Sequence, residues 1–221
     1  KQGVFVLLTE SVGADRPGHT SPSHKISGYF EKALDEAPNR VIVTLYEQNV
    51  YRLIEVLDLA AKYRRKVYFH NEHQRNLLRH VEKLGYYRMP VGIEVSKESF
   101  ENQRDDLIVI VSGSGPNVFK SMLKIASSED PKLELRPSDT VVILSPMVPG
   151  TEKEAGSMEN ELYKCDVSVI SLDRRKVTSM HASIEDIKMV TYLMKPTYYM
   201  PVHGEYRHLI NNANVALDMG F

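Results

Sequence analysis

Short runs of apolar residues recur along the chain, separated by segments in which apolar residues return every three or four positions. The runs are rich in Val, Ile and Leu, as is typical of strands buried on both faces. Strands are predicted at residues 4–8, 41–45, 66–70, 107–111, 140–144, 166–171 and 198–202. Helices are predicted between them at residues 26–36, 50–63, 75–84, 118–126, 154–164, 183–195 and 208–217. This alternation indicates an α/β fold with a parallel sheet flanked by helices.

Composition limits the classes of function. The 221 residues are 42% hydrophobic, which is enough for one large domain or two small ones with a substantial core. The net charge is −1, and binding of nucleic acid by charge alone usually needs a basic excess, so any RNA contact has to come from local patches. The single cysteine, Cys165, excludes an intrachain disulfide framework and fits a reducing compartment, most simply the cytoplasm.

The sequence shows no sign of a membrane segment or a targeting peptide. No apolar run approaches the ~18 residues expected of a membrane span. The first predicted strand begins within a few residues of Lys1, so we expect the sequence to start inside a domain rather than at a natural beginning. The loop rich in Ser and Pro near residue 20 is the best candidate for a domain boundary.

Three residues are candidates for chemistry. Glu10 follows the first predicted strand, and active-site groups of open α/β sheets gather at the carboxyl ends of strands; a solvated loop carboxylate is the simpler interpretation. His181 precedes a helix whose N-cap could be Ser183 and whose N-terminal acid could be Glu185. A lone histidine at such a position is more often structural.

His203 ends the last predicted strand, and the adjacent Gly204 would allow a ligand to approach, so His203 is a reasonable metal ligand. The sequence has no His-x-His-x-Asp-His run and no pair of cysteines. Because zinc needs about four ligands, these scattered residues cannot fix the ion alone.

The turn Gly113-Ser114-Gly115 follows a predicted strand and could hold a phosphate. A tight strand-to-helix turn without a ligand explains it equally well. The Gly-x-Gly-x-x-Gly pattern of dinucleotide-binding folds is not met, because position 118 is Val118.

Three segments resemble signature segments of the ribonuclease J family of ribonucleases. Leu8-Thr9-Glu10-Ser11, followed by Arg16-Pro17-Gly18, resembles the segment with the β-CASP motif A acid. His181-Ala182-Ser183 resembles the motif B segment. The stretch from Pro201 to Leu209 resembles the motif C segment and is the most specific match. Shorter stretches that resemble the same family lie at Ala61-Lys62-Tyr63, Arg136-Pro137 and Pro149-Gly150, so the resemblance covers nearly the whole chain.

The resemblance implies a β-CASP domain with a parallel sheet flanked by helices, plus partial metallo-β-lactamase αββα elements. Residues 1–20 would be a metallo-β-lactamase strand and the motif A loop, residues 21–178 the β-CASP domain, and residues 179–221 a returning metallo-β-lactamase segment with motifs B and C. The activity implied is zinc-dependent RNA hydrolysis, 5'-3' exonucleolytic and endonucleolytic, in RNA processing and decay. Family enzymes hold two zinc ions between their domains. Their His-rich zinc motifs lie upstream of the position of Glu10, so we expect this chain alone to be inactive and without zinc.

The resemblance also implies roles for individual residues. Glu10 falls on the motif A acid, which orients the motif B histidine. His181 falls on that histidine, the general acid or transition-state contact at the scissile phosphate. His203 falls on the motif C zinc ligand. More weakly, Ser183 and Gly204, and the turn residues Gly113 and Ser114, would hold RNA phosphate.

Three RNA-facing segments depart from the family pattern. Met180 stands where the family usually has Gly before the motif B histidine, and Gln48 and Tyr51 replace a Ser and a His. The family turn Gly-Ser-Gln-Gly-Glu-Pro becomes Gly-Ser-Gly-Pro-Asn-Val at residues 113–118, where Pro116 removes a backbone donor. In these changes the sequence resembles the second, weakly active paralogue found beside an active ribonuclease J in some Gram-positive bacteria.

The expected partners are RNA and a ribonuclease J paralogue, in a homo- or hetero-oligomer formed partly by regions outside this sequence, and no membrane. Two other functions stay open. One is a non-catalytic structural partner of an active paralogue. The other is a nucleotide-binding α/β domain unrelated to nucleases, which predicts a phosphate at residues 113–117 and no clustering of Glu10, His181 and His203.

Overall fold

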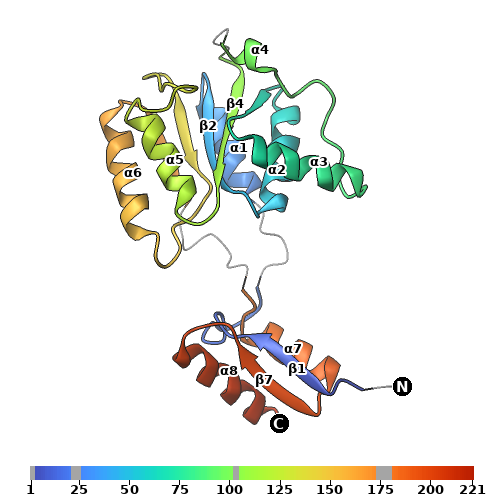
Figure 1. Cartoon of the computed structure of the whole chain (residues 1–221). Coiled ribbons are helices and arrows are strands. Elements are labelled where there is room, and N and C mark those ends of the chain that lie inside the picture. Colours follow the sequence, from blue (N-terminus) through green and yellow to red (C-terminus); the bar gives the residue numbers. More distant parts are fainter. Residues whose placement is uncertain (1–2, 21–25, 102–104, 173–180) are drawn as a thin grey trace. The chain divides into compact units, whose positions relative to one another are not determined.

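The structure is a computed structural model that describes residues 3–20, 26–101, 105–172 and 181–221. The chain divides into two compact units (Figure 1). The smaller unit comprises Lys1–His24 and Thr178–Phe221, and the larger unit comprises Lys25–Val177. All strand pairs in both units are parallel, so the expected α/β class with parallel sheets flanked by helices is confirmed.

The larger unit is built on a five-stranded parallel sheet. Its strands lie in the order β3 (Lys66–Phe69), β4 (Leu107–Gly113), β2 (Val41–Tyr46), β5 (Thr140–Ile143) and β6 (Ser168–Ser171). The three middle strands are buried along almost their whole length. Burial on both faces explains why these strands are continuous apolar runs rather than alternating ones.

Helices cover both faces of this sheet (Figure 1). One face packs against α1 (Ser27–Glu36), α2 (Val50–Lys62) and α3 (Glu72–Lys83). The other packs against α5 (Asn117–Ala126), α6 (Glu152–Lys164) and the short α4 (Lys97–Glu101). The apolar faces of these helices, at the predicted three- and four-residue spacing, form the two halves of the core.

The smaller unit has a parallel pair of strands, β1 (Val6–Glu10) and β7 (Tyr198–Val202), with helices α7 (Ile184–Met194) and α8 (Tyr206–Asp218). Helix α8 packs on β7, and α7 packs on β1 and on α8. The small core of this unit centres on Ala14, Ile187 and Val215. Within the described residues, no helix has the length and apolar character that a membrane crossing requires.

Three differences from the predicted elements have physical explanations. The first strand runs to Glu10, because pairing with β7 continues to the Glu10↔Val202 register, so Glu10 is the last residue of the strand rather than the first of the loop. Helix α3 begins at Glu72, where the Asn71 side chain accepts a hydrogen bond from the His73 N–H. Helix α4 was not predicted, since five residues are too few to show a helical period.

Candidate functional site

The parallel pairing of β1 and β7 sets two candidate residues side by side. The pair ends at Glu10↔Val202. Glu10 and His203, the residue after Val202, therefore lie at the same end of the two strands. The Ser11 N–H extends the pairing by donating to the His203 carbonyl at 2.9 Å. Residues from opposite ends of the sequence are thereby joined by backbone hydrogen bonds.

A tight turn follows β7 and aims the His203 side chain. His203 has φ 55° and Gly204 has φ 141°, both in the region that side chains disfavour. For a non-glycine residue such as His203 this conformation costs about 1–2 kcal/mol. A Cβ on Gly204 would lie 3.1 Å from the Cβ of His208, so the turn needs glycine for space as well as for φ. Strain of this kind is often found at functional sites.

Asn212, in α8, holds the end of β1 in place. Its side chain is fully buried. The Nδ2 group donates to the Glu10 carbonyl at 3.0 Å and to the Ser11 Oγ at 2.9 Å, and Oδ1 accepts from the Tyr199 hydroxyl. One amide therefore connects α8 with both strands and contacts the backbone of Glu10.

Close packing of two loops brings His181 to Glu10. A Cβ on Gly13 would lie only 2.1 Å from the carbonyl oxygen of Ala182, so only glycine allows the loops to approach this closely. The first turn of α7 also bonds to the loop after β1. The N–H groups of Ile184 and Glu185 donate to the carbonyls of Arg16 and Gly18 at 3.0 and 3.2 Å, which satisfies donors that a helix cannot pair internally.

Asp186 is the main polar link between these loops. Its Oδ2 accepts from the N–H of Thr20 at 2.7 Å and from the N–H of Ser183 at 3.0 Å. The Thr20 hydroxyl donates to the His181 carbonyl at 2.8 Å. Ser183 is the N-cap of α7 and Glu185 is an acid of its first turn, as predicted, while the acid that completes the capping box is Asp186.

We predict that Asp186→Asn destabilises the smaller unit by about 1–3 kcal/mol, because it removes a charged acceptor from two backbone N–H groups. The measurement is the free energy of unfolding. The N–H of Thr20, with added hydrogen bonds from His19 and Ser183, outweighs burial and holds the pKa of Asp186 well below its ordinary value of 3.8. A carboxyl group whose pKa is lowered by folding contributes its full stabilisation at pH values above its ordinary pKa. That contribution is lost as the pH falls below the ordinary pKa. The difference in the free energy of unfolding between the parent chain and Asp186→Asn should therefore be constant from neutral pH to about pH 4 and shrink in stronger acid.

Glu185→Gln is the matched control for this prediction. Glu185 is the adjacent carboxylate, but among the residues that the structure describes its side chain bonds only to Lys188 on the surface, at 2.9 Å. Its loss should change stability by no more than about 0.5 kcal/mol. Equal effects of the two substitutions would show that Asp186 contributes nothing specific to the junction.

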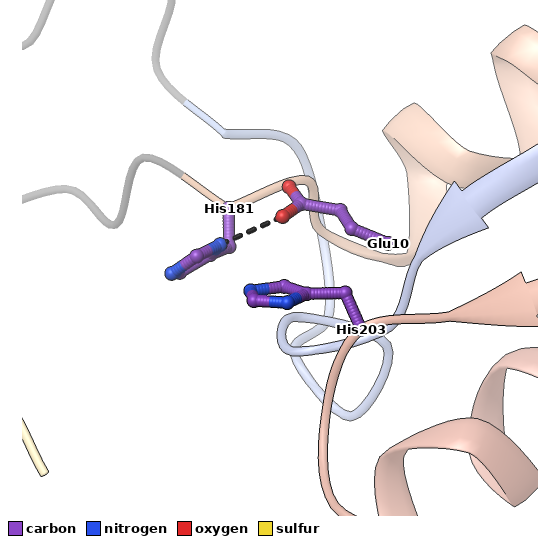
Figure 2. A group of neighbouring side chains, drawn as sticks. All are labelled: Glu10, His181 and His203. Carbon is purple, nitrogen blue, oxygen red and sulfur yellow. Dashed lines mark hydrogen bonds and ion pairs between the residues drawn. The ribbon is translucent and has the colours of Figure 1, made fainter.

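Glu10, His181 and His203 form a cluster (Figure 2). One carboxylate oxygen of Glu10 lies 2.8 Å from the Nδ1 of His181, and the other accepts from the Ala182 N–H at 2.8 Å. The rings of His181 and His203 have centroids 6.0 Å apart. The expectation that Glu10 lies within hydrogen-bond reach of His181 is confirmed, and the clustering contradicts the nucleotide-binding alternative, which predicted that the three residues lie apart.

The electrostatics of the pair assign the proton between Glu10 and His181. Burial by itself would raise the pKa of Glu10, but hydrogen bonds from His181 and the Ala182 N–H outweigh it and lower that pKa. Glu10 is therefore ionised at neutral pH and acts only as an acceptor. It follows that the Nδ1 of His181 donates the proton of this hydrogen bond to Glu10.

The cluster fits a zinc ion chemically. Glu10, His181 and His203 each offer one ligand atom, and these atoms lie within 4.8 Å of one another. Imidazole and carboxylate are ordinary zinc ligands, at about 2.0–2.2 Å from the ion. Both oxygens of Glu10 are already engaged by His181 and Ala182, so His203 is the residue best suited to ligate without breaking these bonds.

We predict that the 221-residue chain retains no stoichiometric zinc after dialysis. One suitable histidine falls well short of the about four ligands that zinc requires. Elemental analysis of the dialysed chain checks this. Stoichiometric zinc that disappears in Glu10→Gln would show that the carboxylate is a ligand and that the three residues form a complete site.

The other candidate residues occupy different surroundings. Ser183 is buried, its hydroxyl lies 3.1 Å from that of Thr20, and Gly204 is exposed in the turn after β7. Gly113 and Ser114 belong to the larger unit, at the end of β4. A Cβ on Gly113 would lie 2.6 Å from the backbone nitrogen of Val118, so close packing of α5 explains this glycine. Phosphate binding by all four stays a prediction, and Met180 lies outside the described residues.

Sequence reasoning missed the residues that support the cluster. Asp186 could have been found, since a serine followed three residues later by an acid is a capping-box pattern. Asn212 gave a weaker signal, a polar residue on the buried face of a helix that also contains Val215. Gly13 and Thr20 gave none, because their importance depends on contacts with residues more than a hundred positions away.

Comparison with known proteins covers the whole chain. The family model described as "Ribonuclease J, beta-CASP domain" matches residues 38–162. A model described as "Zn-dependent metallo-hydrolase RNA specificity domain" matches residues 172–220. Ribonuclease J2 of Bacillus subtilis is 31% identical over 219 residues, which cover 99% of this chain and 40% of that protein. Ribonuclease J of Synechocystis is 30% identical over 222 residues, which cover 100% of this chain and 35% of that protein. The chain thus spans well under half the length of these relatives.

Proposed function

The chain belongs to the ribonuclease J family of RNA-processing metallo-hydrolases, and from that premise we propose that it supplies the proton-transfer residues and one zinc ligand of a ribonuclease. The observation that carries this proposal is the convergence of Glu10, His181 and His203 in a cluster with ligand atoms within 4.8 Å. The supporting loops and Asn212 hold this cluster in a defined geometry.

Each member of the cluster has a distinct role in this proposal. His203 ligates the metal, and zinc, when bound, supplies Lewis-acid activation of water and neutralises charge at phosphorus. His181 gives a proton from Nε2 to the leaving oxygen of the scissile phosphodiester. Glu10 acts through His181, because its ionised carboxylate holds the ring by Nδ1 and fixes the direction of Nε2.

We assign the larger unit to the β-CASP domain and the smaller unit to a metallo-β-lactamase domain that other parts of the protein complete. The substrate class is RNA, in processing or decay, and the compartment is the cytoplasm. RNA contacts are assigned to Ser183, Gly204, Gly113 and Ser114. The near-neutral charge of the chain supports binding through a few directed contacts rather than through a basic surface.

We further propose that the intact enzyme is weakly active because the turn after β4 holds RNA poorly. Pro116 is the N-cap of α5, and proline offers neither a backbone donor nor a capping side chain. Gly115 has φ 50° and no side chain to present. The relatives include proteins named ribonuclease J2 and ribonuclease J at nearly equal identity, so this proposal rests on the turn and not on the names.

Restoring the polar turn is expected to raise RNA cleavage by the full-length protein. The variant combines Met180→Gly with Gly115→Gln, Pro116→Gly and Asn117→Glu, and it leaves Val118 unchanged because that residue is fully buried in the core. Loss of positioning contacts can lower a rate by about 10²-fold, so a gain of up to that size is expected. Single-turnover cleavage of a defined RNA measures it.

The control for this experiment is the free energy of unfolding of the same variant, since glutamine at the φ of Gly115 adds strain. Unchanged cleavage in a stably folded variant with bound zinc would contradict the proposal that the turn limits activity.

A second function is favoured by the same turn: a structural subunit that supports an active ribonuclease J paralogue and cleaves little RNA itself. The missing donor at Pro116 supports it, because it weakens substrate positioning without affecting the fold. Nuclease assays of the full-length protein, alone and with the paralogue, separate the two functions. Cleavage that depends entirely on the paralogue, and that survives His181→Gln in this protein, would establish the structural role.

A further inference from the structure

The C-terminal end of α3 and the loop that follows it form a basic surface on the larger unit (Figure 1). Arg79, Lys83 and Arg88 are all exposed. Arg79 and Lys83 are four residues apart and therefore share one face of the helix. Among the described residues, none of these three cations pairs with a carboxylate, and Arg79 donates only to the Asn76 side chain, at 2.7 Å. We call these three cations, together with Tyr86, the α3 surface.

The acids close to the α3 surface in sequence do not neutralise it. Glu82 and Glu94 both pair with Arg75, at 3.1 and 2.7 Å between the charged atoms. The net charge of the whole chain is only −1. Three cations without an acidic partner within residues 79–88 are therefore a local concentration of positive charge.

The position of Tyr86 is fixed by the way in which α3 ends. Gly85 has φ 76°, and the Tyr86 N–H donates to the Val81 carbonyl at 3.3 Å. A left-handed glycine followed by this backbone hydrogen bond is the Schellman ending of a helix. Tyr86 is nevertheless 82% exposed. The backbone is thus held in place while an aromatic ring faces solvent.

Residues 86–89 present side chains alternately to solvent and to the core. Tyr87 and Met89 pack against the core, and the Tyr87 hydroxyl donates to Asp58 of α2 at 2.8 Å. Tyr86 and Arg88, which alternate with them, are exposed. The inward pair therefore anchors the loop and keeps an aromatic ring and a guanidinium on its outer side.

The α3 surface is complementary to single-stranded RNA. Cations without a carboxylate partner attract backbone phosphates, and an exposed aromatic ring gives a base a face on which to stack. Leu84 and Val91 are also exposed, but apolar side chains would contact a protein or a base equally well. The cations and the ring together favour RNA, because a chain with almost no net charge needs a local basic patch to attract nucleic acid.

We propose that the α3 surface binds single-stranded RNA, with its three cations at phosphates and Tyr86 stacked on a base. This inference rests on the proposed function, which assigns RNA as the substrate class. The α3 surface belongs to the larger unit and shares no residue with the candidate site, so it contributes affinity rather than chemistry. Stacking and phosphate contacts read no base edge, so this binding is independent of sequence.

Removal of the three charges tests the phosphate contacts. The charge variant Arg79→Gln, Lys83→Gln, Arg88→Gln is made in the full-length protein together with His181→Gln, which limits cleavage of the RNA during titration. Fluorescence anisotropy of a labelled uridine homopolymer gives the affinity at several salt concentrations. The charge variant should bind at least about tenfold more weakly than His181→Gln alone. The slope of log affinity against log salt should fall by about 2, since each lost phosphate contact contributes about 0.7.

Three other exposed lysines of the larger unit provide the matched control, Lys124, Lys132 and Lys153. Their replacement by glutamine removes the same charge from other parts of the surface. It should change the RNA affinity by no more than about threefold, because salt screens charges that do not touch the RNA. Equal losses of affinity in the two triple variants would show that the RNA responds only to net charge, and would overturn the proposal.

Two substitutions of Tyr86 separate stacking from charge. Tyr86→Ala should weaken RNA binding by at least about fivefold, because it removes the stacking face. The salt dependence should stay unchanged, since the ring carries no charge. Tyr86→Phe keeps the ring and should bind RNA as tightly as tyrosine does. Full RNA affinity in both Tyr86→Ala and the charge variant would overturn the proposal, and loss of binding to a paralogue instead would identify the α3 surface as a protein interface.

Cleavage of the same RNA by the zinc-loaded protein with His181 intact tests the proposed function separately. Normal cleavage by the parent, with unchanged RNA binding in the α3-surface variants, would overturn only the present inference. No cleavage by the parent, with weakened RNA binding in those variants, would contradict the proposed function and support RNA binding at the α3 surface.

Discussion

Replacing His181 by glutamine in the full-length, zinc-loaded protein is expected to lower the rate of RNA cleavage by about 10²- to 10⁴-fold, the usual contribution of general acid–base catalysis. Glutamine can still donate a hydrogen bond to Glu10, so the loop should keep its place while the proton that leaves from Nε2 is lost. Single-turnover cleavage measures the rate. Elemental analysis should show that the variant holds as much zinc as the parent protein.

Two comparisons make this result specific. His73→Gln changes an exposed histidine of α3 in the larger unit and should leave the rate within about twofold. Glu10→Gln removes the carboxylate that directs the ring but keeps His181, so its effect should be smaller than that of His181→Gln. A full rate in His181→Gln with zinc bound would exclude the histidine from the chemistry.

Replacing His203 by alanine in the full-length protein is expected to weaken zinc binding by at least about a hundredfold. Loss of groups that merely orient a ligand typically costs 10- to 100-fold in metal affinity, and loss of the ligand itself should cost no less. RNA cleavage should fall with the metal content. Competition against a zinc chelator gives the affinity, and cleavage is measured at matched zinc occupancy.

The backbone turn provides the control for His203→Ala. Alanine keeps the Cβ that makes φ 55° unfavourable, so the substitution leaves the left-handed strain of the turn unchanged. Circular dichroism and the unfolding midpoint should therefore stay close to those of the parent. Unchanged zinc affinity in the folded variant would show that His203 is not a ligand.

Local sequence patterns predicted most of the helices and strands but few of the residues that support the candidate site. The buried strands and the amphipathic helices produce strong periodic signals, and those predictions were correct to within a few residues. The end of β1 was misjudged because Thr9 and Glu10 are polar, although pairing with β7 keeps them in the strand. That pairing joins distant segments and leaves no trace in the sequence around Glu10.

The three central residues were found through their motifs, whereas the residues that hold them depend on long-range geometry. Asn212 lies about two hundred positions from the strand whose end it holds, and nothing near it in the sequence indicates that contact. Gly13 is one of several glycines in the chain, and only its 2.1 Å approach to the Ala182 oxygen distinguishes it. Side chains that act by contact with distant segments become visible only when the fold is known.

Because the smaller unit is assembled from the two ends of the sequence, its folding order is constrained. β1 is synthesised before its partner β7, which follows only after the whole of Lys25–Val177. Closing so long a flexible loop before any of it is ordered costs entropy that grows with its length. The larger unit, whose strands each pair with neighbours inside Lys25–Val177, can fold independently and shorten that loop. During synthesis β1 therefore stays without its partner β7 until that segment emerges, and its exposed apolar side chains can promote aggregation in this interval.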